Sequence, residues 1–185
     1  MSRDEALVQA CIRQERVAQR QLYELFASKL FAAALRYTKN RADAEDVLQD
    51  SFIKIYEKIK DFRFESPLEA WLRRIVVNTA LKHLRNQPNW SLHIDNNEVE
   101  DELGHTENAL SGFQFEQLME MVNSLPDACR AVFNLYAIEG YKHHEIAEIL
   151  GVAEGTSKSQ FSRARSLLQA KIGFLSDKCH VPSAK

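Results

Sequence analysis

Residues 139–168, EGYKHHEIAEILGVAEGTSKSQFSRARSLL, have the pattern of two short helices joined by a tight turn. The first helix ends at Gly151, because glycine readily adopts the left-handed conformation that follows many helices. The second opens at Gly155-Thr156, where the threonine hydroxyl can cap the backbone. Its apolar residues share one face by three-and-four spacing: Phe161, Ala164, Leu167 and Leu168. The stretch therefore predicts a helix-turn-helix.

The other faces of this second helix are basic and hydroxyl-bearing, and no acid occurs from Gly155 to Ser176. In a DNA-binding helix-turn-helix, the second helix enters the major groove and reads base edges. An ordinary helical hairpin with a solvated front is the alternative, but the acid-free front and the glycine turn occur together. The candidate DNA contacts are Thr156, Lys158, Ser159, Ser162, Arg163 and Arg165.

Composition indicates a globular, cytoplasmic protein of 185 residues, 45% of them hydrophobic and 27% charged. No apolar run reaches the ~18 residues of a membrane span, and no export signal is visible at the N-terminus. Three cysteines without a CxxC spacing favour neither a disulfide nor a zinc site. His144-Glu145 begins a near match to the zinc-protease HExxH, but Glu148 stands where the second histidine is needed. We expect no metal, no cofactor and no enzymatic activity.

Charge is strongly segregated along the chain, although the net charge is only −2. Residues 1–85 carry sixteen Lys or Arg and twelve acids, whereas residues 86–129 carry nine acids and no Lys or Arg. Residues 130–185 carry eight bases and five acids. Two basic bodies joined by an acidic segment describe the chain better than its mean charge.

The sequence predicts four parts. Residues 1–86 form an N-terminal helical domain, in which residues 4–14, 17–38, 43–60 and 68–85 are helices. Residues 87–112 lack periodicity and form a flexible acidic linker. Residues 113–175 form the C-terminal domain that contains the helix-turn-helix, and residues 176–185 form a tail. The expected fold class is therefore all-α, with two small helical domains.

The predicted helix over 43–60 has two distinct faces. Leu48, Phe52, Ile55 and Ile59 lie within a narrow arc and are expected in the core. Asp43 is expected to cap the helix. The opposite face either is simply solvated or docks a basic partner helix, and its exposed aliphatic residue among acids favours docking. That face consists of Asp46, Gln49, Asp50, Ile53 and Glu57.

The predicted helix over 68–85 is apolar around most of its circumference, and Ser66 is expected to cap it. One stripe is polar: Arg74, Asn78, Lys82 and Arg85. Basic side chains with an amide suit phosphates and an unpaired base, although Asn78 can equally face water. Trp71, at the upper end of the stripe, is expected in the core rather than as a stacking platform.

Three blocks of this sequence resemble the extracytoplasmic-function (ECF) sigma factors, small two-domain members of the bacterial primary-sigma family. The blocks are ALRYTKNRADAEDVLQDSFIKIYEKI, FRFESPLEAWLRRIVVNTALKHLR and LPDACRAVFNLYAIEGYKHHEIAEILGVAEGTSKSQFSRARSLL. They occur in order, with the acidic segment before the third, and cover nearly the full chain. The resemblance implies a dissociable subunit that directs bacterial RNA polymerase to promoters.

The resemblance also implies roles for the residues above. Asp46, Gln49, Asp50 and Ile53 would dock on the clamp helices of the largest polymerase subunit, and the C-terminal domain on the flap of the second largest. The stripe from Arg74 to Arg85 would read the minus-ten element, and the second motif helix the minus-thirty-five element. An anti-sigma factor is a further partner that the family implies. Members commonly carry Val and a basic residue where Ser157 and Gln160 stand, which bears on the promoter sequence.

A free-standing helix-turn-helix regulator is the alternative, with N-terminal helices that sense a ligand or dimerise. Such a regulator needs neither the Asp46–Glu57 face nor the stripe from Arg74 to Arg85. The sequence therefore favours a sigma factor.

Overall fold

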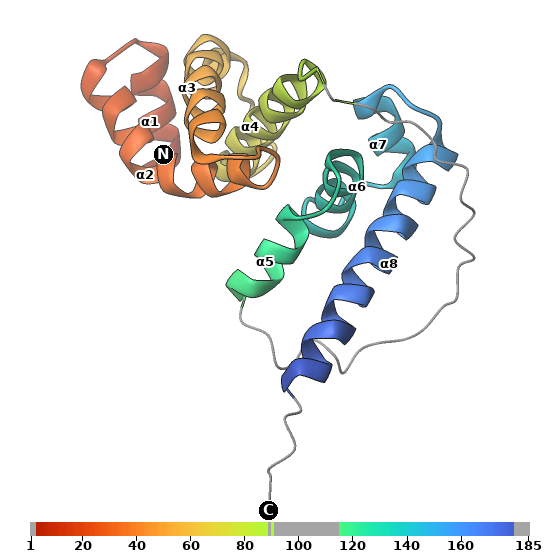
Figure 1. The fold of residues 1–185 in the computed structure, drawn as a ribbon. Coiled ribbons are helices and arrows are strands. Elements are labelled where there is room, and N and C mark those ends of the chain that lie inside the picture. The colour runs from red at the N-terminus through yellow and green to blue at the C-terminus, as the bar shows by residue number, and fades with distance from the viewer. Residues whose placement is uncertain (1–2, 89, 91–114, 180–185) are drawn as a thin grey trace, which may run out of the picture. The chain divides into compact units, whose positions relative to one another are not determined.

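The computed structural model describes residues 3–88, 90 and 115–179. In the last of these stretches, it describes the side chains of residues 117–173 only. All regular structure within these residues is helical, as predicted (Figure 1). The chain divides into two compact units, Met1–Pro88 and Asn89–Lys185. Most of the linker predicted at 87–112 lies outside the described residues.

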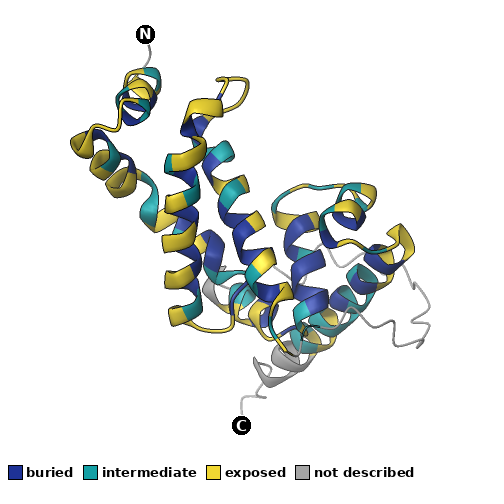
Figure 2. Cartoon of the chain, turned by 90° about the horizontal axis from the view of Figure 1, so that it is seen from above, coloured by how far each residue is buried: buried dark blue, intermediate teal, exposed yellow. Residues whose placement is uncertain are grey.

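The first unit is a helical bundle built from α1 (Arg3–Ile12), α2 (Arg16–Leu35), α3 (Arg41–Lys58) and α4 (Leu68–Arg85), with a short 3₁₀-helix, η1 (Ile59–Asp61), after α3. Helices α2, α3 and α4 pack against one another, and α1 packs against α2 and η1. Figure 2 shows the buried residues along the inward sides of these helices. The predicted core residues of α3 and η1 are all buried: Leu48, Phe52, Ile55 and Ile59.

The predicted caps of α3 and α4 are wrong. Helix α3 begins two residues early, because Asn40 is its cap and the Asn40 Oδ1 accepts from the Asp43 backbone N–H at 2.8 Å. Helix α4 begins after Pro67, and neither Ser66 nor any other side chain caps it. Pro67 occupies the cap position of α4 instead, and proline is common at helix starts because of its fixed backbone angle.

The second unit contains α5 (Phe115–Asn123), α6 (Asp127–Phe133), a π-helical turn η2 (Asn134–Ile138), α7 (His143–Leu150) and α8 (Glu154–Cys179). Helix α8 packs against α5, α6 and α7. The predicted apolar face of α8 is confirmed, since Ala164 is buried and Leu167 and Leu168 pack against the same core. That core also contains Val122, Leu125, Cys129 and Phe133.

The turn between α7 and α8 confirms the role of glycine and corrects the start of the second helix. Gly151 is left-handed, with φ of 70° and ψ of 40°. Helix α8 begins at Glu154, so Thr156 lies inside its first turn and is not the cap. It also continues to Cys179, past the predicted boundary between domain and tail at 175. No helix in the described ranges has the length and apolarity to cross a membrane.

Candidate nucleic-acid and polymerase interfaces

The front of α8 carries most of the predicted DNA contacts at its surface. Lys158 and Ser159 are exposed, and Ser162, Arg163 and Arg165 are partly exposed. Thr156 is different, because its side chain is only 8% exposed. A buried side chain has little surface to offer to DNA, so the structure does not support Thr156 among the side-chain contacts. The other five residues form a front that we call the α8 front.

Two polar residues of α8 face the interior instead. Ser157 is fully buried, and its hydroxyl lies 2.9 Å from the Nδ1 of His143. Gln160 is 5% exposed and accepts a hydrogen bond from the Cys129 thiol at 3.0 Å. These contacts fix α8 against α7 and α6. Their residue types therefore bear on the packing of the second unit, and the effect of Ser157 and Gln160 on the promoter sequence stays a prediction.

Helical spacing could have identified these buried polar residues. Ser157 and Gln160 precede Ala164 by seven and four positions, so they share its face. His143 is partly buried, and its ring stacks on that of Tyr136 with centroids 4.4 Å apart. Burial lowers the pKa of His143, and the nearby Lys158 lowers it further, against a smaller opposing effect of Glu154. The imidazole is therefore stabilised in its neutral form.

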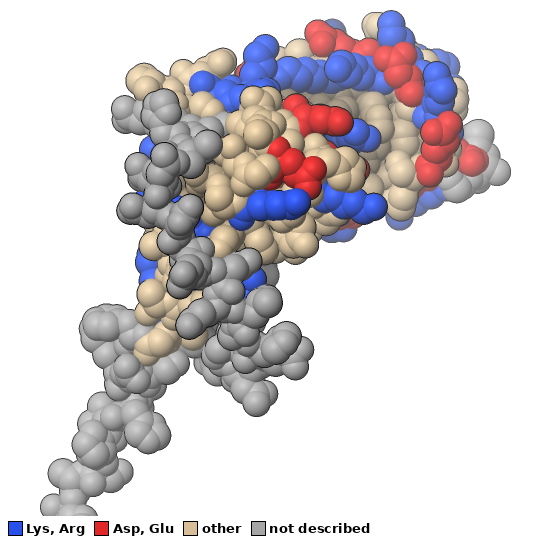
Figure 3. Space-filling model, turned by 90° about the vertical axis from the view of Figure 1, so that its right-hand side faces the viewer, with Lys and Arg blue, Asp and Glu red and all other residues tan. Residues whose placement is uncertain are grey.

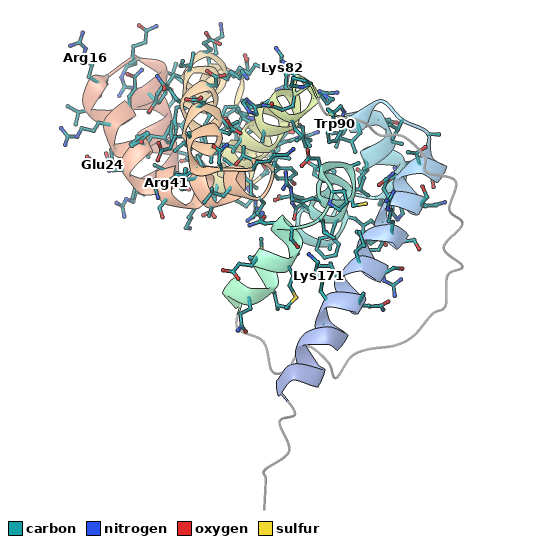
Figure 4. All side chains as sticks on the ribbon, viewed as in Figure 1. Arg16, Glu24, Arg41, Lys82, Trp90 and Lys171 are labelled. Carbon is teal, nitrogen blue, oxygen red and sulfur yellow. The ribbon has the colours of Figure 1, made fainter. Side chains whose placement is uncertain are left out.

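The stripe on α4 is exposed as predicted. Arg74, Asn78, Lys82 and Arg85 are all exposed, while the rest of the helix contributes eight buried residues to the first unit. Figure 4 labels Lys82 near the end of α4, where its side chain points away from the bundle. We call this surface the α4 stripe. Three cations and an amide on one helix face can contact phosphates and one unpaired base.

Three aromatic rings lie beside the start of this stripe. Trp71 is half-buried and packs on Phe62 with ring centroids 5.2 Å apart. The rings of Phe62 and Phe64 also pack together, with centroids 4.7 Å apart. Trp71 is thus part of a packed aromatic cluster, although it is half-buried and does not lie in the fully buried core as predicted. Phe64 is 40% exposed and holds a left-handed backbone with φ of 59°, which is rare for an aromatic residue.

The outer face of α3 is exposed throughout. Asp46, Gln49, Asp50 and Glu57 are exposed, and Ile53 between them is 52% exposed. We call these five residues the α3 face. A half-exposed isoleucine within a ring of polar side chains has the composition of a protein-docking surface. On the face drawn in Figure 3, acidic and basic side chains of the described residues are mixed.

Within the residues that the structure describes, no group of three or more His, Cys, Asp or Glu side chains could hold a metal ion. Cys11 and Cys129 are buried thiols, and burial raises the pKa of each. A helix-turn-helix with a cationic front, a second basic helix face and a docking face together define a DNA-binding transcription protein that works with another protein.

Comparison with known proteins gives the family. Residues 22–88 match the model described as Sigma-70 region 2, and residues 115–168 match Sigma-70, region 4. The chain is 33% identical over 180 residues to the ECF RNA polymerase sigma-E factor of Haemophilus influenzae, covering 91% of this chain and 95% of that one. It is 32% identical over 175 residues to the ECF RNA polymerase sigma factor SigM of Mycobacterium tuberculosis, covering 93% and 86%.

The chain therefore belongs to the ECF RNA polymerase sigma factors. It is an alternative sigma factor, a regulatory subunit with which RNA polymerase initiates transcription at specific promoters. The broader family is better described as sigma-70 than as the primary-sigma family. Among solved structures, CnrH in complex with the cytosolic domain of CnrY has the same fold, with a TM-score of 0.50 and 23% identity over 92% of this chain and 97% of that one.

Proposed function

We propose that each of the three exposed faces has one task in transcription initiation. The α3 face binds the clamp helices of the largest polymerase subunit, the α4 stripe contacts the minus-ten element, and the α8 front reads the minus-thirty-five element. The second unit docks on the flap of the second largest subunit. The observation that carries the proposal is the exposure of Ile53 within the polar α3 face, because a regulator acting alone has no use for that surface.

The α3 face offers an apolar centre and an acidic rim to a basic partner helix. Charged rims steer association, and the apolar centre supplies contact area. We expect Asp50→Lys and Ile53→Ser each to weaken core binding while leaving the unfolding transition unchanged. Glu45→Lys is the matched control, since Glu45 is an exposed acid of α3 that pairs with Arg41 outside this face. If wild type and all three variants bind core polymerase with equal affinity, the α3 face is only a solvated surface and not a docking site.

The α4 stripe combines phosphate contacts with one amide. We propose that Asn78 pairs with the Watson–Crick edge of one base, which is exposed only where the strands have separated. Asn78→Ala should therefore reduce open-complex formation by holoenzyme and leave binding to the minus-thirty-five element intact. Lys82→Ala should instead weaken binding alike on all sequences. Equal loss of both promoter contacts in Asn78→Ala would contradict the assigned role.

A substitution on the α8 front can distinguish a base contact from a phosphate contact. If Arg163 contacts a base, Arg163→Ala should cost about 1–3 kcal/mol of promoter discrimination at one position. Selection from a promoter library with reconstituted holoenzyme measures this directly. A uniform loss on all sequences would assign Arg163 to a phosphate.

The decisive experiment adds the chain to sigma-free core polymerase. We expect transcripts from defined start sites with core, and weak duplex binding by the chain alone. Tight and specific duplex binding without transcripts would contradict this function and support a free-standing regulator. We also infer from the family that an anti-sigma factor is a partner. The proposed role requires no catalytic step of this chain.

A further inference from the structure

The first turn of α8 contains an acid at the edge of the cationic α8 front. Helix α8 begins at Glu154, so this acid belongs to the recognition helix. The residues that follow it, from Gly155 to Ser176, include no other acid. The Glu154 side chain is 48% exposed, and that of Lys158, one turn later, is 61% exposed. Residues near the start of a recognition helix are those that contact base edges.

Glu154 and Lys158 present a carboxylate and an ammonium side by side. The Glu154 Oε1 and the Lys158 Nζ are 2.7 Å apart. This hydrogen bond and the lysine charge lower the pKa of Glu154, and His144 and His143 lower it further, against a small effect of burial. The carboxylate is therefore ionised at neutral pH. An exposed pair of this kind adds little to stability, and an acid beside DNA phosphates weakens binding.

A C·G base pair offers the matching pattern in the major groove. The N4 amino donor of cytosine lies beside the O6 acceptor of guanine, and guanine N7 provides a second acceptor. An A·T pair also has an adjacent donor and acceptor, but adenine N7 would face the carboxylate and the thymine methyl would face the ammonium. Resting on the proposed minus-thirty-five role of α8, we propose that Glu154 and Lys158 together read one C·G base pair of that element.

In this arrangement the Glu154 carboxylate accepts from cytosine N4, and the Lys158 ammonium donates to guanine O6 and N7. Glu154 also holds Lys158 near the base edge before DNA arrives. Without Glu154, the lysine extends freely and reaches phosphates or any acceptor in the groove. Glu154 is thus a specificity-determining residue that exchanges some affinity for discrimination.

The test is selection from a promoter library randomised over the minus-thirty-five element, with holoenzyme reconstituted from core polymerase and the full chain. We expect Glu154→Ala to reduce the preference for C·G at one position by roughly 5- to 150-fold, the range of one good base contact. The other positions should keep their preferences. Glu148→Ala is the control, because it removes an exposed acid from α7 in the same motif and should leave every preference unchanged.

Two results would overturn the inference. One is a uniform gain in affinity of Glu154→Ala on all sequences, which would make Glu154 only a repulsive charge. The other is a preference profile identical to wild type. Arg163→Ala in the same selection separates this failure from that of the proposed function. If Arg163→Ala loses discrimination or weakens binding on all sequences, and Glu154→Ala leaves the profile unchanged, only the C·G inference fails. If Arg163→Ala changes neither the profile nor the affinity, the role of α8 fails as well.

Discussion

At the residue scale, buried polar groups organise the second unit. Arg130 is only 3% exposed, and its guanidinium lies 3.0 Å from the Asp127 carboxylate and donates to the Asn123 carbonyl at 3.1 Å. Burial lowers the pKa of Arg130, and Asp127 opposes this change. The guanidinium thus joins the end of α5 to the start of α6. Sequence alone did not reveal this role, because an isolated arginine on a short helix usually faces water.

Asp127→Ala should be strongly destabilising. The substitution leaves the buried guanidinium without its counter-charge, a loss that costs about 3 kcal/mol or more when one partner of a buried pair is removed. Urea unfolding followed by circular dichroism measures the change in the free energy of unfolding. Glu148→Ala, at an exposed position, should stay within about 0.5 kcal/mol of wild type. A loss for Asp127→Ala as small as that of the control would mean that Arg130 is solvated in solution.

His143 should make stability depend on pH. Its folded pKa lies below the ordinary value near 6.5 because of burial and Lys158, so the unfolded chain binds more protons between the two values. The contribution of neutral His143 to the free energy of unfolding is complete above the ordinary pKa and is lost as the pH falls toward the folded pKa. Between about pH 7.5 and about pH 5.5, wild type should therefore lose more thermal stability than His143→Gln. His144→Gln is the exposed control, and equal pH slopes for wild type and His143→Gln would contradict the expectation.

At the element scale, periodicity predicted which helix faces are buried. The arc from Leu48 to Ile59 and the face containing Ala164 are both in the core. Helix ends were less predictable. A cap depends on where the preceding chain turns, so Asn40 and not Asp43 caps α3. Likewise, the sequence placed the start of α8 at Gly155, whereas the backbone becomes helical at Glu154 and so brings an acid into the recognition helix.

Two glycines should respond in opposite directions to alanine. Gly151 is left-handed at the end of α7, and a Cβ there would meet no atom within 4 Å, so backbone strain alone sets the cost. Gly151→Ala should destabilise by about 1 kcal/mol. Gly173 lies within α8, also with open space for a Cβ, and Gly173→Ala should stabilise by about 0.5–1 kcal/mol. Denaturant midpoints measure both, and a shift in the same direction would contradict the backbone argument.

At the scale of the whole molecule, the charge segregation and the missing periodicity of residues 87–112 predicted a division of the chain. The chain does divide into two compact units, Met1–Pro88 and Asn89–Lys185. The two sigma-70 models match residues 22–88 and 115–168, one in each unit. Residue type alone favours the surface for polar side chains such as Ser157 and Gln160. Their place in the interior of the second unit could be predicted only from their helical spacing to Ala164.

Each unit should fold by itself, since each has its own buried core. The isolated fragment 1–88 contains the α3 face and the α4 stripe, so we expect it to bind core polymerase and single-stranded minus-ten DNA. The fragment 113–185 should bind minus-thirty-five duplex only weakly, because the polymerase contacts of the first unit no longer contribute. Amide spectra of both fragments, compared with those of the full chain, test folding, and titrations test binding. A fragment 1–88 that is folded yet fails to bind core polymerase would show that the second unit supplies the primary polymerase contact, and the α3 face would lose its proposed task.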